Sequence, residues 1–306
     1  MRKNGRLTLA VLAAGIVLST AVRSSVIAAH TDMKTGFLFH GDEPLCNILY
    51  YGIILAAAVT SVFTSRIGEK GCVVGSAADI SGSGTVVTGF LALGTGMLSA
   101  YEGISELRAV SPMLFLTVID LLFAAVLLVI GFATLYKKRF TPGLGYTYSL
   151  IGVYCVFRGL YSFMNRMVIV TVPEYLIETL SLICMSVYFL MLGRYLSGNE
   201  TRRTPGAICF WGTWASALVL SSALGTVIAS LAASGEVSER IVFSTYAAES
   251  FRQASRGIDA YNMVITPWVN LILGVMIVVS VVMMLGSPAR SSLDGSQDGS
   301  ADIPEE

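Results

Sequence analysis

Three charged residues stand within long apolar stretches of this sequence and could do chemistry there: Asp120, Arg158 and Glu178. Charges at membrane depth are costly, so each is expected to have a partner inside the protein. One interpretation is an ion pair between Asp120 and Arg158 that ties two helices together. The other makes a carboxylate a proton or cation acceptor beside a fixed positive charge, with a pKa set by its neighbours. We favour the ion pair, because one pair and one further Glu are less than a proton relay needs.

The segments that must position these charges are eight apolar runs joined by short polar connectors. A helix rises about 1.5 Å per residue, so a run of about 20 apolar residues matches a hydrocarbon core about 30 Å thick. The connectors are too short to hold a soluble domain. This predicts an all-α, polytopic transmembrane helix bundle that forms one domain over residues 1–285. The runs cover residues 7–29, 45–64, 85–101, 112–136, 144–164, 176–196, 207–232 and 264–285.

Composition points to the lipid bilayer as the main partner of the chain. Hydrophobic residues make up 54% of the 306 and charged residues 13%, against about 25% charged residues in a soluble domain. The 20 Lys and Arg balance the 20 Asp and Glu, so no excess charge points to nucleic acid. Other membrane proteins stay open as partners, and the sequence names no small-molecule or ion substrate.

The distribution of Lys and Arg predicts the orientation of the bundle. With the N-terminus inside and one crossing per run, twelve of these residues lie on the cytoplasmic side, six lie outside and two lie within helices. Cytoplasmic connectors of membrane proteins carry an excess of Lys and Arg. We therefore expect a multi-pass cell-membrane protein with both termini in the cytoplasm.

In this arrangement the three charges stand at similar depths. The fourth and fifth runs are joined by the tight turn at residues 137–143 and form an antiparallel hairpin. Counted from the cytoplasmic ends at about 1.5 Å per residue, Asp120 is about 24 Å up, Arg158 about 21 Å and Glu178 about 27 Å. These depths are within the reach of an arginine side chain. Whether the helices turn the three side chains toward one another does not follow from the spacing.

The first run has two interpretations. It follows a basic N-terminus, and Ser19-Thr20-Ala21 is similar to a signal-peptidase site, so residues 1–21 could be a cleaved signal peptide. The apolar stretch continues to Ala29, interrupted by Arg23, and is then long enough to span. We favour an uncleaved anchor in which Arg23 lies near the outer boundary and reaches toward it.

The third run, residues 85–101, is short and contains Gly89, Gly94 and Gly96. One interpretation is a thin or tilted span buried among its neighbours, because small residues permit close contact between helices. The other is a broken helix that lines a transport site. We favour the packed span, since glycine is common in membrane helices.

Two segments are predicted to lie outside the spans. The connector from Ala233 to Asn262 has apolar residues at helical spacing, which predicts an external amphipathic surface helix that caps the bundle. The tail, residues 286–306, is rich in Ser, Asp and Gly and is expected to be a disordered cytoplasmic segment. The apolar face of the external helix comprises Phe243, Ala247, Phe251, Ala254, Ile258 and Tyr261.

The motifs of enzymes and of metal or cofactor sites are missing from the sequence. The first external connector offers at most His40, Asp42 and Glu43 to a metal, and such a loop is usually only solvated. The glycine-rich stretch at residues 68–75 does not place a lysine and a hydroxyl residue where a P-loop has them. The five cysteines are scattered without a C-x-x-C pair, which argues against disulfides or a thiolate metal site. No metal, no cofactor and no catalytic residue is expected.

One stretch resembles a group of known sequences. From about residue 145 to 230, an aromatic run ends near Arg158, the next closes with Gly193-Arg194-Tyr195, and a basic connector follows at residues 201–205. This pattern resembles uncharacterised multi-pass membrane proteins of Gram-positive anaerobic bacteria. The resemblance implies a bacterial inner-membrane location, and that group offers no activity or functional residue to carry over.

Three functions compete on this sequence. A non-enzymatic membrane-embedded partner or sensor component needs no polar cavity and fits the sparse charges. A small-solute or ion transporter would use Asp120, Arg158 and Glu178, but the chain lacks the internal repeat that many carriers show. An intramembrane enzyme comes third, because no nucleophile with a base and no set of metal ligands is present.

Overall fold

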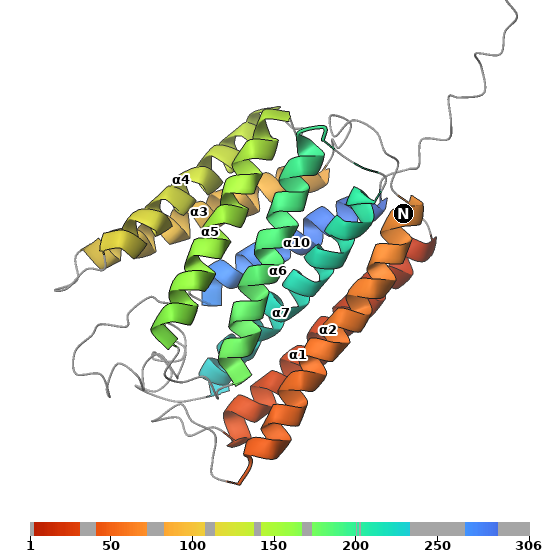
Figure 1. Ribbon diagram of the computed structural model, residues 1–306, viewed down its shortest axis with the longest axis vertical. Helices are drawn as coiled ribbons and strands as arrows, with labels where there is room; N and C mark the ends of the chain where they lie inside the picture. The colour runs from red at the N-terminus through yellow and green to blue at the C-terminus, as the bar shows by residue number, and fades with distance from the viewer. Residues whose placement is uncertain are drawn as a thin grey trace, which may run out of the picture.

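The computed structural model describes residues 3–30, 41–71, 83–107, 114–137, 142–166, 173–199, 201, 203–232 and 267–286. Within these ranges the chain forms helices and short turns, without a strand (Figure 1). The helices are α1 (Lys3–His30), α2 (Glu43–Gly71), α3 (Ser83–Leu107), α4 (Leu114–Lys137), α5 (Pro142–Arg166), α6 (Pro173–Leu196), α7 (Thr204–Ala232) and α10 (Pro267–Gly286).

The apolar character of these helices is that of a membrane protein. Of the helices that the structure describes, six are long and apolar enough to cross a membrane: α1, α2, α3, α4, α6 and α7. In α10 the apolar stretch is shorter, from Trp268 to Met284. The helix α5, which carries Arg158 and many tyrosines, is not among the six. Each of the eight predicted runs nevertheless coincides with a helix.

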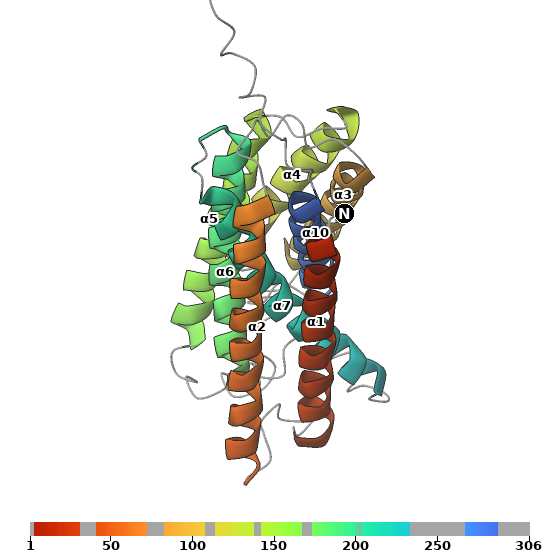
Figure 2. The same ribbon diagram turned by 90° about the vertical axis from the view of Figure 1, so that its right-hand side faces the viewer.

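The helix α7 is the centre of the bundle. It packs on α1, α2, α6 and α10, and both views show it between the α1–α2 pair and the other helices (Figures 1 and 2). Its apolar window is 67% buried, the largest share among the six candidate spans. Small residues on several faces, such as Gly212, Ala215 and Ser216, allow four neighbours to approach the same helix.

Contacts between helices show that neighbours along the chain run in opposite directions. Gly145 at the start of α5 meets Gly193 near the end of α6, and in the α3–α4 pair Gly89 meets Leu135 while Gly103 meets Leu121. By contrast α1 and α7 run in the same direction, since Arg23 lies against Gly225 near the end of α7. Successive helices therefore alternate in direction.

The third predicted run is longer than expected and is an unbroken helix. The helix α3 covers 25 residues, and its candidate span extends from Gly84 to Ile104. Gly89 and Gly96 of α3 pack against α4. An added Cβ on Gly96 would stand 3.1 Å from the carbonyl oxygen of Ala124. These two glycines let two helices pack closely, as the packed-span interpretation requires.

The side chain of Arg23 does not reach out of the bundle as expected. Its side chain is 3% exposed, and its aliphatic stem packs on Gly225 of α7, where an added Cβ would stand 2.8 Å from the Arg23 Cδ. The side chain is therefore packed inside the bundle, and a position of Arg23 near the outer membrane boundary stays a prediction. The predicted surface helix between residues 233 and 262 and the predicted tail after Gly286 lie outside the described residues.

Candidate functional site

The candidate site joins α4 to α5. Asp120 stands in the second turn of α4, and Arg158 stands in the outer half of α5 by the predicted orientation. Tyr154 precedes Arg158 by four residues, so both side chains leave the same face of α5. Because the two helices are antiparallel, this face of α5 meets Asp120 at one level of the bundle.

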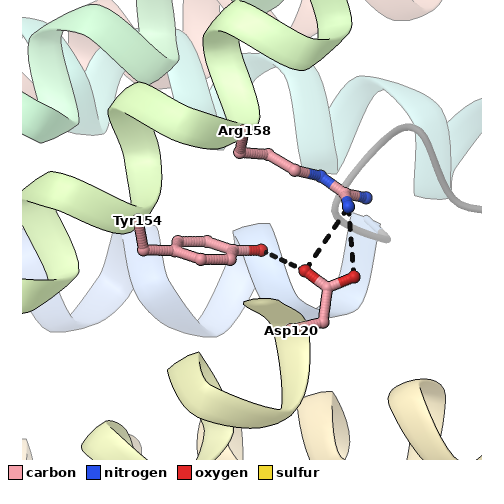
Figure 3. Close-up of polar contacts among 3 residues, drawn as sticks. All are labelled: Asp120, Tyr154 and Arg158. Atoms are coloured by element: carbon pink, nitrogen blue, oxygen red, sulfur yellow. Dashed lines mark hydrogen bonds and ion pairs between the residues drawn. The ribbon is translucent and has the colours of Figure 1, made fainter. Parts of the chain in front are cut away.

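The three side chains form one hydrogen-bonded group (Figure 3). The Arg158 Nη1 donates to Asp120 Oδ2 at 3.1 Å and lies 3.4 Å from Oδ1. The Tyr154 hydroxyl donates to Asp120 Oδ1 at 2.8 Å. Both oxygens of the carboxylate therefore accept from α5. Hydrogen bonds to a charged acceptor are stronger than those between neutral groups.

Burial makes this group energetically important. The side chain of Arg158 is 2% exposed and that of Asp120 is 14% exposed. Charges taken out of water attract each other more strongly in a medium of low dielectric constant, but each would be costly without its partner. The Tyr154 ring also stacks on Phe123 of α4, with ring centroids 3.9 Å apart and an angle of 6° between the planes. The group is thus both a polar and an apolar connection between α4 and α5.

The role of Tyr154 was missed from the sequence. From the sequence, ordinary packing and interfacial anchoring explain most of the aromatic residues of the fifth run. A signal was present, because Tyr154 and Arg158 are spaced four residues apart on one helix face and Asp120 was expected at the same depth. Sequence spacing does not tell which of several tyrosines faces α4.

Two of the three predicted charges, Asp120 and Arg158, form an ion pair with each other. A second ion pair joins His30 to Asp42. Glu178 stands near the start of α6 with a partly buried side chain. It lies one turn before Leu182, which contacts α5 at Gly159. Glu178 therefore stands on the helix face that packs on α5, near the ion pair.

The second ion pair joins the last residue of α1 to the residue that precedes α2. The Nδ1 of His30 lies 2.9 Å from the Oδ2 of Asp42, and both side chains are partly exposed. Asp42 is one of the three residues considered as metal ligands, and His40 lies outside the described residues. The described part of the chain contains no group of three His, Cys, Asp or Glu residues that could hold a metal ion.

The comparisons add no identity to this geometry. No family model, no curated protein and no solved structure matches the chain. The resemblance to membrane proteins of Gram-positive anaerobic bacteria therefore stays a prediction. What the site can do follows from its own contacts. A buried ion pair holds α4 and α5 together, and its carboxylate also accepts a hydrogen bond from the Tyr154 hydroxyl.

Proposed function

We propose that this protein is a non-enzymatic membrane-embedded partner or sensor component that acts through the contacts of its helices. The observation that carries the proposal is the Asp120–Arg158–Tyr154 group. Its carboxylate is bound through both oxygens by residues of α5, so the intramembrane charges serve to fasten helices. A protein with this arrangement offers its outer helix surfaces to neighbours in the membrane.

The α3–α4 pair is the part of the bundle best suited to such contacts. The two helices pack on each other more extensively than on any other helix, and they join the rest of the bundle through α10 and α5. They lie at the side opposite the α1–α2 pair (Figure 1). Large apolar side chains face outward on both, including Phe90 at 64% and Phe132 at 64% exposure. Lipid or the helix of another membrane protein can cover such residues.

The same proposal includes a cell-membrane location with eight crossings and both termini in the cytoplasm. Support comes from the alternating directions of the described helices and from the excess of Lys and Arg in the connectors assigned to the cytoplasm. A bacterial source is proposed on the resemblance alone.

A small-solute or ion transporter is the alternative. The observation that favours it is the incomplete burial of Asp120, whose side chain is 14% exposed, together with the partly buried Glu178 on the neighbouring helix. A carboxylate that is not fully enclosed, beside a fixed arginine, is the kind of group that accepts a proton or a cation.

Two measurements separate these functions. Purified protein in sealed vesicles is tested for proton, sodium and potassium flux with entrapped indicators. A photoreactive residue in place of Phe132 is tested in cells for one reproducible protein adduct, with Leu127, which is 0% exposed, as the control position. The partner function predicts an adduct at position 132 and flux equal to that of empty vesicles. Flux that Asp120→Asn abolishes, without an adduct at position 132, would establish the transporter instead.

A further inference from the structure

Four hydroxyl side chains from four helices meet in the interior of the bundle. They are Thr134 of α4, Tyr148 of α5, Tyr188 of α6 and Ser280 of α10, with exposed fractions of 0%, 1%, 0% and 5%. The Tyr148 hydroxyl lies next to Thr134 and within electrostatic range of Tyr188. The Tyr188 hydroxyl in turn lies next to Ser280. We call these four residues the hydroxyl cluster.

The hydroxyl cluster is separate from the ion pair. Thr134 stands three residues before the end of α4, and Tyr148 six residues after the start of α5. At about 1.5 Å per residue these positions are about 5 Å and 9 Å from the helix ends that the predicted orientation places inside. Tyr188 and Ser280 are about 12 Å and 9 Å from the corresponding ends of α6 and α10. Asp120 belongs to the opposite half of the membrane.

A glycine makes room for the central tyrosine. The Tyr188 ring lies on Gly212 of α7, where an added Cβ would stand 2.8 Å from a ring carbon, and Val281 of α10 borders the same position. The ring is thus held between α7 and α10, with its hydroxyl near that of Ser280. This packing fixes the Tyr188 hydroxyl at a point where four helices converge.

Two of the four hydroxyls have unused hydrogen-bonding capacity. Within the part of the chain that the structure describes, Thr134 Oγ1 and Tyr188 Oη each lie close to a neighbouring hydroxyl, but neither has a partner in hydrogen-bonding geometry. Ser280 donates its proton to the carbonyl oxygen of Met276 at 2.9 Å, so its oxygen can still accept. Buried hydroxyls are nearly always hydrogen-bonded, and a small bound molecule commonly completes them.

We propose that the hydroxyl cluster is a binding site for water in the inner half of the bundle. Its four side chains are uncharged, which suits a neutral molecule better than an ion. A water molecule donates two hydrogen bonds and accepts two, so it can accept from Tyr188 while it donates to Ser280 or Thr134. A water molecule bound at the hydroxyl cluster would link α4, α5, α6 and α10, because each of these helices contributes one side chain to the cluster.

The sign of a stability change tests the proposal. If water completes the hydrogen bonds, Tyr188→Phe and Thr134→Val each remove a satisfied group and lower the melting temperature by about 2–4 °C in detergent. If the site is dry, the same changes remove an unsatisfied polar group, and the melting temperature stays constant or rises. The control Tyr146→Phe, at a residue 71% exposed, should leave the melting temperature unchanged.

Direct observation of the site gives the second measurement. A high-resolution map of the parent protein in lipid should show density within hydrogen-bonding distance of Tyr188 Oη, and a map of Tyr188→Phe should lose it. Absence of this density in the parent, or a melting temperature that stays constant or rises in both variants, would overturn the proposal. This test does not depend on whether the protein is a partner or a transporter.

Discussion

At the scale of single residues, the buried charges form an ion pair that links α4 to α5. Asp120 and Arg158 come from antiparallel neighbours, and Tyr154 adds a third polar contact to the same carboxylate. Removing water from charged groups is costly, and their attraction offsets that cost only while both partners are present. The single residues are therefore expected to depend on each other.

The double variant should be more stable than either single variant. Asp120→Leu leaves a buried guanidinium and Arg158→Leu leaves a buried carboxylate, and each should lower the free energy of unfolding by about 3 kcal/mol. Asp120→Leu/Arg158→Leu removes both charges and should recover most of the loss. Reversible unfolding in mixed detergent micelles measures all four proteins. Strictly additive losses would show that the pair is not coupled and that the charges are retained for another purpose.

Replacement of Tyr154 by phenylalanine isolates the phenol. Tyr154→Phe keeps the stacking on Phe123 but removes the hydrogen bond of 2.8 Å to Asp120. A hydrogen bond to a charged group contributes about 1.5–3 kcal/mol, so the unfolding free energy should fall by that amount. In the Asp120→Leu background the same change should have almost no effect. An equal loss in both backgrounds would mean that the phenol acts through another contact.

At the scale of helices, close approach depends on glycine positions. On α5, an added Cβ at Gly145 would stand 2.5 Å from the carbonyl oxygen of Gly193 on α6, whereas Gly143 has no atom within 4 Å. Such contact lets dispersion forces act between helices in a lipid environment, where apolar burial contributes little. The packing of α5 on α6 also sets the orientation of α5 and hence of Arg158.

Alanine should discriminate between the two glycines of α5. Gly145→Ala must push α6 away and should cost about 1–3 kcal/mol of stability. Gly143→Ala meets open space and should be neutral or slightly stabilising, because alanine favours helix more than glycine does. Melting temperatures of the two variants in the same detergent provide the measurement. Equal effects would indicate that α5 and α6 do not pack at this seam in the membrane.

Valine should discriminate between two glycines of α3 in the same way. An added Cβ on Gly96 would stand 3.0 Å from Leu128 Cγ and 3.1 Å from the Ala124 carbonyl oxygen of α4, closer than van der Waals contact, whereas an added Cβ on Gly94 would meet no atom within 4 Å. Gly96→Val should lower the unfolding free energy by about 1–3 kcal/mol, while Gly94→Val should have a much smaller effect. Unfolding by detergent titration compares them. If Gly94→Val were the more damaging change, a broken helix would again be the better interpretation of α3.

At the scale of the whole molecule, the alternating helices predict which ends lie on the same side. Lys137 at the end of α4 should be cytoplasmic and Pro44 at the start of α2 external. With Cys72 replaced by serine, an impermeant maleimide should label Pro44→Cys in intact cells and Lys137→Cys only after permeabilisation. The four described native cysteines are buried and should not react. Labelling of both positions from outside would require an even number of crossings between them, where the proposed topology has three, and hence a revised topology.

The sequence by itself determined that the chain is a bundle of membrane helices and which charges lie within it. Run length and composition suffice for this, because a hydrocarbon core admits only segments whose backbone hydrogen bonds are satisfied internally. The depth of Asp120 relative to Arg158 also followed from residue counts at a fixed rise per residue.

The tertiary structure decided which side chains face one another. Helix rotation and packing depend on contacts between residues far apart in sequence, as when Gly212 receives the ring of Tyr188 or Gly225 receives the stem of Arg23. A hydropathy pattern with apolar residues on all faces leaves that rotation open. For this reason Tyr154, buried Arg23 and the hydroxyl cluster emerged only from the folded molecule, whereas the spans could be predicted beforehand.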